Sequence, residues 1–147
     1  MIEFAGIFDQ NGWMGVYLDT FKKKTRFKVW IKIRSVDKAL IETVQQAIYT
    51  YGIIKKAENK EALPIMEKDG FFWLNFQGGT ALRIIQEIYP SLVIQKLQAD
   101  GIFELQNRKK FAVTGKKLPL EEVAARMEIR KRIYEMNKTM FIQKTSI

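Results

Sequence analysis

The sequence contains no cysteine and no histidine among its 147 residues. The absence of cysteine excludes disulfide bonds and thiolate catalysis. The absence of histidine excludes Ser-His-Asp triads, imidazole acid–base chemistry and most zinc or iron sites. Any metal ion would need oxygen ligands, which favour Mg²⁺ or Ca²⁺. The chemistry open to this chain therefore rests on carboxylates, amides, hydroxyls and cations.

Membrane-spanning and secretory segments are missing as well. No apolar run approaches the ~18 residues of a membrane-spanning helix, so we expect no membrane partner. The first residues lack the basic and apolar parts of a signal peptide. We therefore expect an intracellular protein, in the cytoplasm, the nucleoid or an organelle matrix, and not a secreted one. The length and the 47% hydrophobic content predict one globular domain.

Positive charge is unevenly distributed along the chain. The formal net charge is +9. Residues 1–107 hold 14 Lys and Arg against 12 Asp and Glu, whereas residues 108–147 hold 11 against 4. A basic cluster of this kind indicates a polyanionic partner such as nucleic acid.

The clearest strand pattern is RFKVWIKIR, residues 26–34. Apolar residues alternate there with four cations and one tryptophan over nine positions. An alternation with period two predicts a strand with one buried face. Its exposed face carries Arg26, Lys28, Trp30, Lys32 and Arg34.

The remaining patterns predict an α+β fold with a four-stranded antiparallel sheet. Helical spacing, caps and stop signals predict helices at 2–11, 37–51, 80–89, 91–107 and about 119–137. Strand patterns lie at 13–19, 26–34, 53–58 and 71–77, and 64–67 is a further candidate for a short strand. Helices would cover one face of the sheet and leave the other open and basic. We predict one domain at 1–107 and a basic C-terminal extension at 108–147.

The segment FAGIFDQNG, residues 4–12, resembles the nine-residue motif of the LAGLIDADG family, best known as homing endonucleases. The identical positions are Ala5, Gly6, Asp9 and Gly12. The segment YPSLVIQKLQADG, residues 89–101, resembles a second signature of the family. The resemblance covers about residues 1–107. It implies an αββαββα fold whose four-stranded sheet sits on a duplex like a saddle, with the C-terminal helices added to it.

The resemblance also implies an association of two chains. The motif helices of two units pack side by side in this family, and small residues let the two backbones approach closely. One motif in a chain of this length implies a homodimer, and a subunit of a larger ribonucleoprotein is the alternative. The implied interface residues are Phe4, Ala5, Gly6, Phe8 and Asp9.

A DNA-binding surface is implied as well. Outward-pointing strand residues would lie in the major groove, and basic residues near the first strand turn would contact phosphates. The implied phosphate contacts are Lys22, Lys23, Lys24 and Arg26. The implied groove contacts are Tyr17, Lys28, Trp30, Lys32, Arg34, Lys55, Asn75 and Gln77.

Asn11 departs from the active-site pattern of the family. Active members have an acid there, because Mg²⁺ prefers charged oxygen ligands and then lowers the pKa of the attacking water. Asn11 offers a neutral carbonyl oxygen, and helix geometry turns Asp9 away from it. Lys96 is the candidate for the active-site lysine of the family. We expect no catalytic residue set, no metal and no other cofactor, with Mg²⁺ bound only if nuclease activity persists.

These observations predict a nucleic-acid-binding protein of the LAGLIDADG type. The favoured function is duplex DNA binding by a homing-endonuclease descendant with weak or lost nuclease activity. An RNA-binding, maturase-like or ribonucleoprotein subunit is one alternative, in which the basic extension would contact the RNA backbone. An active magnesium-dependent homing endonuclease is the other.

Overall fold

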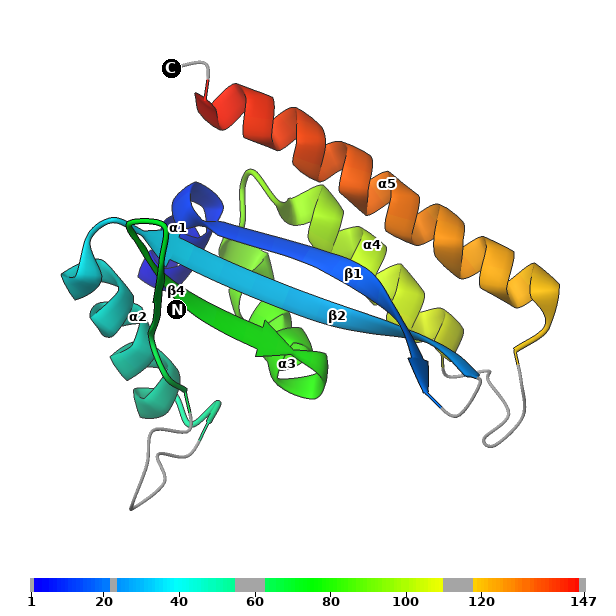
Figure 1. Cartoon of the computed structure of the whole chain (residues 1–147), viewed down its shortest axis with the longest axis horizontal. Helices are drawn as coiled ribbons and strands as arrows, with labels where there is room; N and C mark the ends of the chain where they lie inside the picture. The colour runs from blue at the N-terminus through cyan, green and yellow to red at the C-terminus, as the bar shows by residue number, and fades with distance from the viewer. Residues whose placement is uncertain (1, 22–23, 55–62, 110–117, 146–147) are drawn as a thin grey trace.

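The computed structural model describes residues 2–21, 24–54, 63–109 and 118–145 (Figure 1). The predicted α+β class with a four-stranded antiparallel sheet is confirmed. None of the helices in these ranges is long and apolar enough to cross a membrane. The elements are α1 (Ile2–Asn11), β1 (Gly12–Phe21), β2 (Lys24–Ser35), α2 (Lys38–Thr50), β3 (Met66–Lys68), β4 (Phe71–Gln77), α3 (Gly78–Ile88), the 3₁₀ turn η1 (Tyr89–Ser91), α4 (Lys96–Lys109) and α5 (Leu120–Thr145).

The sheet has the strand order β1-β2-β4-β3, and every neighbouring pair is antiparallel. Its central strand β2 pairs with β1 on one side and with β4 on the other. Side chains that lie directly opposite each other share a face of the sheet. The alternation in β2 therefore decides which face is buried, as the sequence predicted. The buried face of β2 consists of Phe27, Val29, Ile31 and Ile33.

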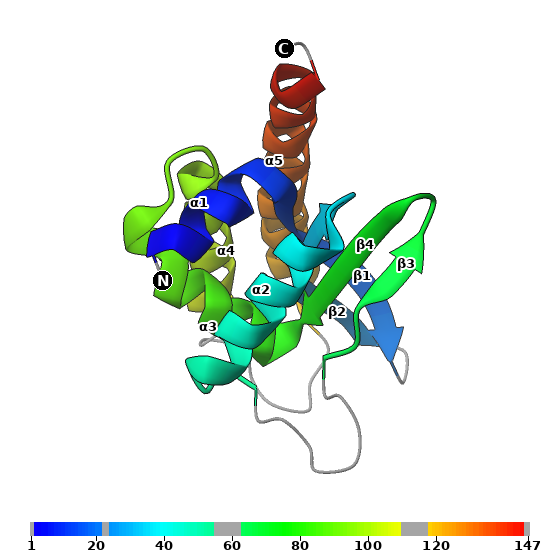
Figure 2. The ribbon, with the colours of Figure 1, turned by 90° about the vertical axis from the view of Figure 1, so that its left-hand side faces the viewer.

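Four helices, α1 to α4, lie on the buried side of the sheet (Figure 2). The apolar positions of α3 show why: Ala81, Ile84, Ile85 and Ile88 follow the i, i+3, i+4, i+7 spacing that places side chains on one helix face. All four side chains are fully buried. Across β2 and β4 the opposite side of the sheet is left uncovered by these helices.

The last helix, α5, is longer than predicted. It continues to Thr145, whereas the sequence predicted an end near residue 137. It runs beside α4 and along the edge strand β1 (Figure 1). Arg130 Nε donates a hydrogen bond to Val16 O at 3.1 Å, and Asn137 Nδ2 donates one to Met14 O at 2.7 Å. The helix thus satisfies edge-strand carbonyls that could otherwise pair with another chain. The proposed boundary at residue 107 stays a prediction.

The predicted strand at 53–58 is wrong in its described part. Ile53 and Ile54 form a bend after α2, and the rest of that segment lies outside the described residues. Ile53 instead packs into the hydrophobic core, where its side chain is 9% exposed. The sheet is instead completed by β3, which overlaps the candidate strand at 64–67. An apolar pair after a helix therefore served core packing and not strand pairing.

The predicted helix at 91–107 begins later than expected, at Lys96. Pro90 lies in the 3₁₀ turn that follows α3. The backbone N–H groups of Val93 and Gln95 are bound to Asp9 of α1. These contacts hold residues 92–95 as a loop against the motif helix.

Candidate nucleic-acid interface

The sheet face turned away from the helices gathers cations and aromatic rings. The cross-strand pairs Tyr17–Lys28 and Lys32–Asn75 define this face, because paired side chains point the same way. All three tryptophans of the chain lie on it. We call it the open sheet face. Its described members are Trp13, Gly15, Tyr17, Asp19, Lys24, Arg26, Lys28, Trp30, Lys32, Arg34, Met66, Lys68, Phe71, Trp73, Asn75 and Gln77.

Positive charge dominates the open sheet face. Its one carboxylate among these described members is Asp19, which accepts a hydrogen bond from the Arg26 guanidinium. That bond holds the pKa of Asp19 below its usual range, so the carboxylate stays ionised and paired. No described carboxylate forms an ion pair with Lys28, Lys32 or Arg34. The face therefore attracts a polyanion.

Several cations lie over aromatic rings of the same face. Lys32 Nζ is 5.3 Å from the ring centre of Trp30. The Arg34 guanidinium carbon is 4.4 Å from the ring centre of Phe71 and 5.3 Å from that of Trp73. Contacts of this kind attract the cation to the ring. They hold long side chains along the sheet and place charge beside flat apolar surfaces.

Most of the predicted DNA contacts lie on the open sheet face. These are Tyr17, Lys24, Arg26, Lys28, Trp30, Lys32, Arg34, Asn75 and Gln77. Three others, Lys22, Lys23 and Lys55, lie outside the described residues. Trp73 was missed, although its alternation with Asn75 and Gln77 is a signal that places it on this face. Contact with nucleic acid stays a prediction for all of them.

The arginines of the C-terminal segment are bound within the protein. Arg108 makes two hydrogen bonds to the Glu122 carboxylate, at 2.9 and 3.1 Å, and Arg126 makes a third at 3.0 Å. Arg108, followed by Arg126, therefore lowers the pKa of Glu122 below its usual value. Arg132 bonds to Glu104 at 2.6 Å, and Arg130 to a β1 carbonyl. Much of the C-terminal positive charge thus fastens α5 to its own domain.

Asn11 lies at the tip of α1, where the family has its metal-binding acid. Its Nδ2 donates a hydrogen bond to Ile7 O, one turn back in the helix, at 3.3 Å. The next residue, Gly12, starts β1 directly. A Cβ atom on Gly12 would collide with the Phe8 ring and lie 2.8 Å from Phe8 O, so the chain turns here only with glycine. The tip is thus built as a tight, amide-capped helix end.

Buried amide groups surround this helix tip. Gln95 is 0% exposed, and its Nε2 donates to Phe8 O at 3.2 Å and to Gly12 O at 2.9 Å. Within the described ranges, no group of three His, Cys, Asp or Glu side chains gathers that could hold a metal ion. Amides and backbone carbonyls do not supply the charged oxygens that Mg²⁺ prefers. The described residues at this tip thus offer neutral amide and carbonyl oxygens, and the expectation of no metal stays a prediction.

Lys96 lies at the start of α4 and faces Tyr89. Its Nζ is 5.1 Å from the ring centre of Tyr89. The Tyr89 hydroxyl donates a hydrogen bond to Asp100 Oδ1 at 2.6 Å, which raises the pKa of Tyr89. The described contact of Lys96 is thus with Tyr89 and not with the tip of α1. A catalytic role for Lys96 stays a prediction.

The predicted dimer residues lie mostly inside the protomer. Phe4, Ala5, Phe8 and Asp9 are each at most 4% exposed and belong to the core or its border. Asp9 accepts the backbone N–H groups of the 92–95 loop. Gly6 is exposed, and no atom lies within 4 Å of the position of a Cβ added there. On α1, Gly6 is therefore the one member of the predicted set that a second chain could reach.

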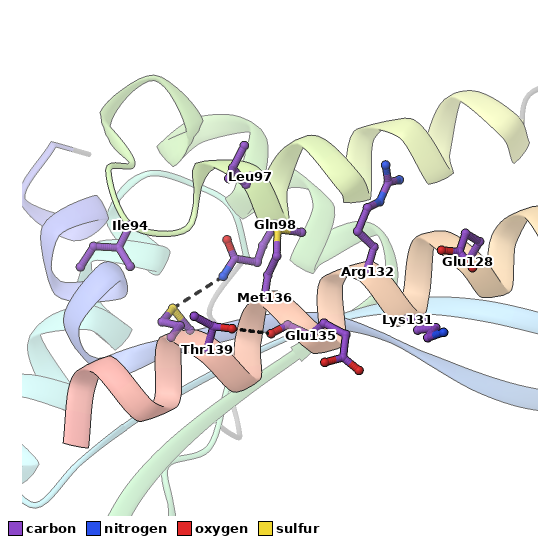
Figure 3. Close-up of a pocket in the computed structure, with 10 residues that line it drawn as sticks. Ile94, Leu97, Gln98, Glu128, Lys131, Arg132, Glu135, Met136 and Thr139 are labelled. Carbon is purple, nitrogen blue, oxygen red and sulfur yellow. Dashed lines mark hydrogen bonds between the residues drawn. The ribbon is translucent and has the colours of Figure 1, made fainter. Parts of the chain in front are cut away.

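A hollow lies between α4 and α5 (Figure 3). It measures about 510 Å³ and is lined by apolar side chains that include Leu97 and Met136. Gln98 Nε2 lies 3.7 Å from Met140 Sδ at its inner end. Its rim carries both signs of charge: Glu128, Glu135, Lys131 and Arg132. A mixed rim does not favour a polyanion, so the open sheet face remains the candidate interface.

The sequence and the fold were compared with those of known proteins. No family model and no curated protein matches the sequence. Solved structures do match. The homing endonuclease I-TnaI aligns over 95% of this chain and 97% of its own, with a TM-score of 0.64 and 12% identity. The chain has the LAGLIDADG homing-endonuclease fold.

Two further structures with this fold were solved with DNA. I-CvuI, in complex with its target, aligns over 95% of this chain and 92% of its own, with a TM-score of 0.55 and 13% identity. The LAGLIDADG homing endonuclease I-GzeII, in complex with a DNA target, aligns over 90% of this chain and 43% of its own, with a TM-score of 0.60 and 16% identity.

Asn11→Asp is expected to lower the free energy of unfolding by about 1 kcal/mol. A carboxylate cannot donate to Ile7 O, and its charge lies at the negative end of the α1 dipole. Urea denaturation with and without Mg²⁺ measures the change. Asn11→Gln is the control, because it keeps the donor and the neutral charge. An Asn11→Asp variant that Mg²⁺ stabilises above the wild type would contradict our description of this tip.

Proposed function

We propose that this protein binds duplex DNA through the open sheet face and descends from a homing endonuclease whose nuclease activity is weak or lost. The row of cations and polar side chains on β2 and β4 carries the DNA-binding part of this proposal. The shared fold of I-CvuI and I-GzeII, both solved with DNA, supports it.

The chemistry of the open sheet face suits a duplex. The major groove is about 12 Å wide and admits a two-stranded β-ribbon, as β1 and β2 form here. Lys and Arg bind phosphates, and both also bind the acceptors of guanine. The amides of Asn75 and Gln77 suit adenine. Charge and base-reading groups are therefore present on one continuous surface.

The weak or lost nuclease activity follows from the tip of α1. A carboxylate there would be needed to bind Mg²⁺ and to lower the pKa of the attacking water. The tip instead offers two neutral amides: that of Asn11, whose NH₂ group donates to its own helix, and that of Gln95, whose NH₂ group donates to Phe8 O and Gly12 O. The proposal of lost cleavage rests on this donor set.

A homodimer is the assembly that we propose for the DNA complex. The exposed Gly6 lets a second α1 approach closely. The backbone N–H of Val93, in the 92–95 loop, is bound to Asp9 of α1. Val93 adds an apolar side chain to this surface that is 82% exposed. This chain aligns with 97% of I-TnaI but with 43% of I-GzeII. Such coverages suit a domain that is present once in a short chain, which then pairs with a second copy, and more than once in a long chain.

Lys32→Ala and Arg34→Ala test the proposed interface. If the side chain contacts a base, each substitution is expected to weaken DNA binding by about 1–3 kcal/mol. If it contacts a phosphate, the slope of log K against log salt concentration should fall by about one. Fluorescence anisotropy with a labelled duplex at several salt concentrations measures both quantities. Arg83→Ala is the control, because Arg83 is an exposed cation on α3, on the helical side of the sheet. Equal losses from Arg34→Ala and Arg83→Ala would overturn the proposal.

A further inference from the structure

A hollow of about 350 Å³ opens on the sheet face between two tryptophans. Trp30 of β2 lines one end of it and Trp73 of β4 lines the other. Lys32 and Asn75 are direct cross-strand partners between them. Met66 from β3 closes the side. The hollow is thus built from three strands, which makes its shape a property of the sheet and not of a loop.

The aromatic walls of this hollow are held in position. The Trp30 ring lies on Gly15, where an added Cβ would be 2.5 Å from the indole, so any larger residue at position 15 would displace it. Trp73 Nε1 donates to Lys68 O at 3.4 Å. Both tryptophans are half-buried, and Lys32 and Arg34 lie over the rings of Trp30 and Trp73, each 5.3 Å from the ring centre, so a base that stacks there takes the place of these cations. Rings of this kind are platforms on which unpaired bases stack.

The polar groups of the hollow are amides and cations. Gln77 Oε1 accepts the Tyr17 hydroxyl at 3.0 Å, which orients the Gln77 amide. Asn75 Oδ1 has no hydrogen-bond partner among the described residues, and Asn75 Nδ2 contacts the Met66 sulfur at 3.4 Å. An acceptor without a partner is unfavourable, and the amino group of a base would satisfy it. Met66 is 52% exposed and flexible, so it can move aside.

We propose that this hollow binds an unpaired nucleobase of the DNA target. The base stacks on the indoles, its polar edge meets the amides of Asn75 and Gln77, and its flanking phosphates meet Lys32. The inference rests on the proposed function, since it requires the open sheet face to be the DNA interface. An intact duplex presents only base edges to a protein. A bulged base is already unstacked, so its placement in the hollow costs least.

The test compares a perfect duplex with the same duplex carrying one bulged base. Both are labelled and titrated by fluorescence anisotropy at one salt concentration. The wild type is expected to bind the bulged duplex about ten-fold more tightly, because stacking contributes about 1–3 kcal/mol per base and 1.4 kcal/mol is ten-fold. Trp73→Leu and Trp30→Leu should each remove most of this preference, measured within each variant as the ratio of its affinities for the bulged and the perfect duplex.

The control variant is Trp13→Leu. Trp13 lies on the same face but packs against Phe141 of α5, with ring centres 5.9 Å apart, outside the hollow. It should keep the preference for the bulged duplex. A preference that is absent in the wild type, or unchanged in both Trp30→Leu and Trp73→Leu, would overturn the base-binding site. If Lys32→Ala still weakens binding to the perfect duplex, the proposed function survives that failure.

An RNA hairpin with an unpaired loop forms a third arm of the titration. Weaker binding to the hairpin than to the bulged duplex supports a DNA target. Tighter binding to the hairpin, lost in Trp73→Leu, would keep the hollow as a base-binding site but overturn its assignment to DNA. Absence of binding to all three probes at low salt would overturn the proposed function itself.

Discussion

Asp9→Ala is expected to lower the free energy of unfolding by about 3 kcal/mol. The carboxylate is 4% exposed and accepts the backbone N–H of Val93 at 2.7 Å and that of Gln95 at 3.0 Å. Alanine would leave both N–H groups without an acceptor, and a buried donor in that state costs about 1–3 kcal/mol. Urea denaturation measures the loss as a lower midpoint at an unchanged slope.

Two control variants sharpen this experiment. Asp9→Asn keeps the volume and one acceptor oxygen, but its NH₂ group cannot accept the second N–H, so about half of the loss should appear. Glu3→Ala removes an exposed carboxylate from the same helix and should change stability by less than about 0.5 kcal/mol. If Asp9→Ala unfolded at the wild-type midpoint, the carboxylate would not be what holds the 92–95 loop.

Asp9 and Asn11 show what a motif does and does not predict. The segment FAGIFDQNG indicated the correct fold and the correct position of the helix. It did not predict that Asp9 would bind a loop more than 80 residues away along the chain, because that contact depends on tertiary packing. Nor did it show that four of the five predicted dimer residues are buried within the protomer. Burial follows from the neighbours of a helix, and a motif does not contain them.

The sheet was predictable where alternation was long and failed where it was short. In β2, nine residues with period two, 26–34, predicted both the strand and its faces. The open sheet face followed from that single pattern, together with most of its candidate contacts. The pair Ile53-Ile54 has no alternation. The local sequence therefore did not distinguish a strand from a bend whose side chains pack into the core. The short β3 is held by its pairing with β4, which local sequence does not specify.

The C-terminal charge was the least predictable feature. A net charge of +7 in residues 108–147 indicated a nucleic-acid tail. The structure instead uses Arg108, Arg126, Arg130 and Arg132 for hydrogen bonds within the domain. Composition counts charges but does not show which are already neutralised. These arginines are thus engaged within the domain, and the open sheet face, which the sequence already favoured for DNA binding, stays the candidate interface. No described carboxylate pairs there with Lys28, Lys32 or Arg34.

Ile133→Ala is expected to lower the free energy of unfolding by about 2–5 kcal/mol, the range for a large buried side chain cut to alanine. Ile133 is 1% exposed and packs against Gly101 of α4. Loss of this contact loosens α5, which covers the edge strand β1. Urea denaturation gives the stability loss. Light scattering at rising concentration should also show association of the variant, because an uncovered edge strand pairs with other chains.

A double-mutant cycle with Gly101→Ala identifies the contact itself. A Cβ at position 101 would lie 2.9 Å from Ile133 Cγ1 and 3.1 Å from Cδ1. In the wild type, Gly101→Ala therefore adds crowding against Ile133, which offsets the roughly 1 kcal/mol that alanine contributes to a helix interior. In the Ile133→Ala background the new methyl group occupies vacated space, so the same change should stabilise by about 1 kcal/mol or more. Strict additivity of the two substitutions would mean that α4 and α5 do not meet through this pair.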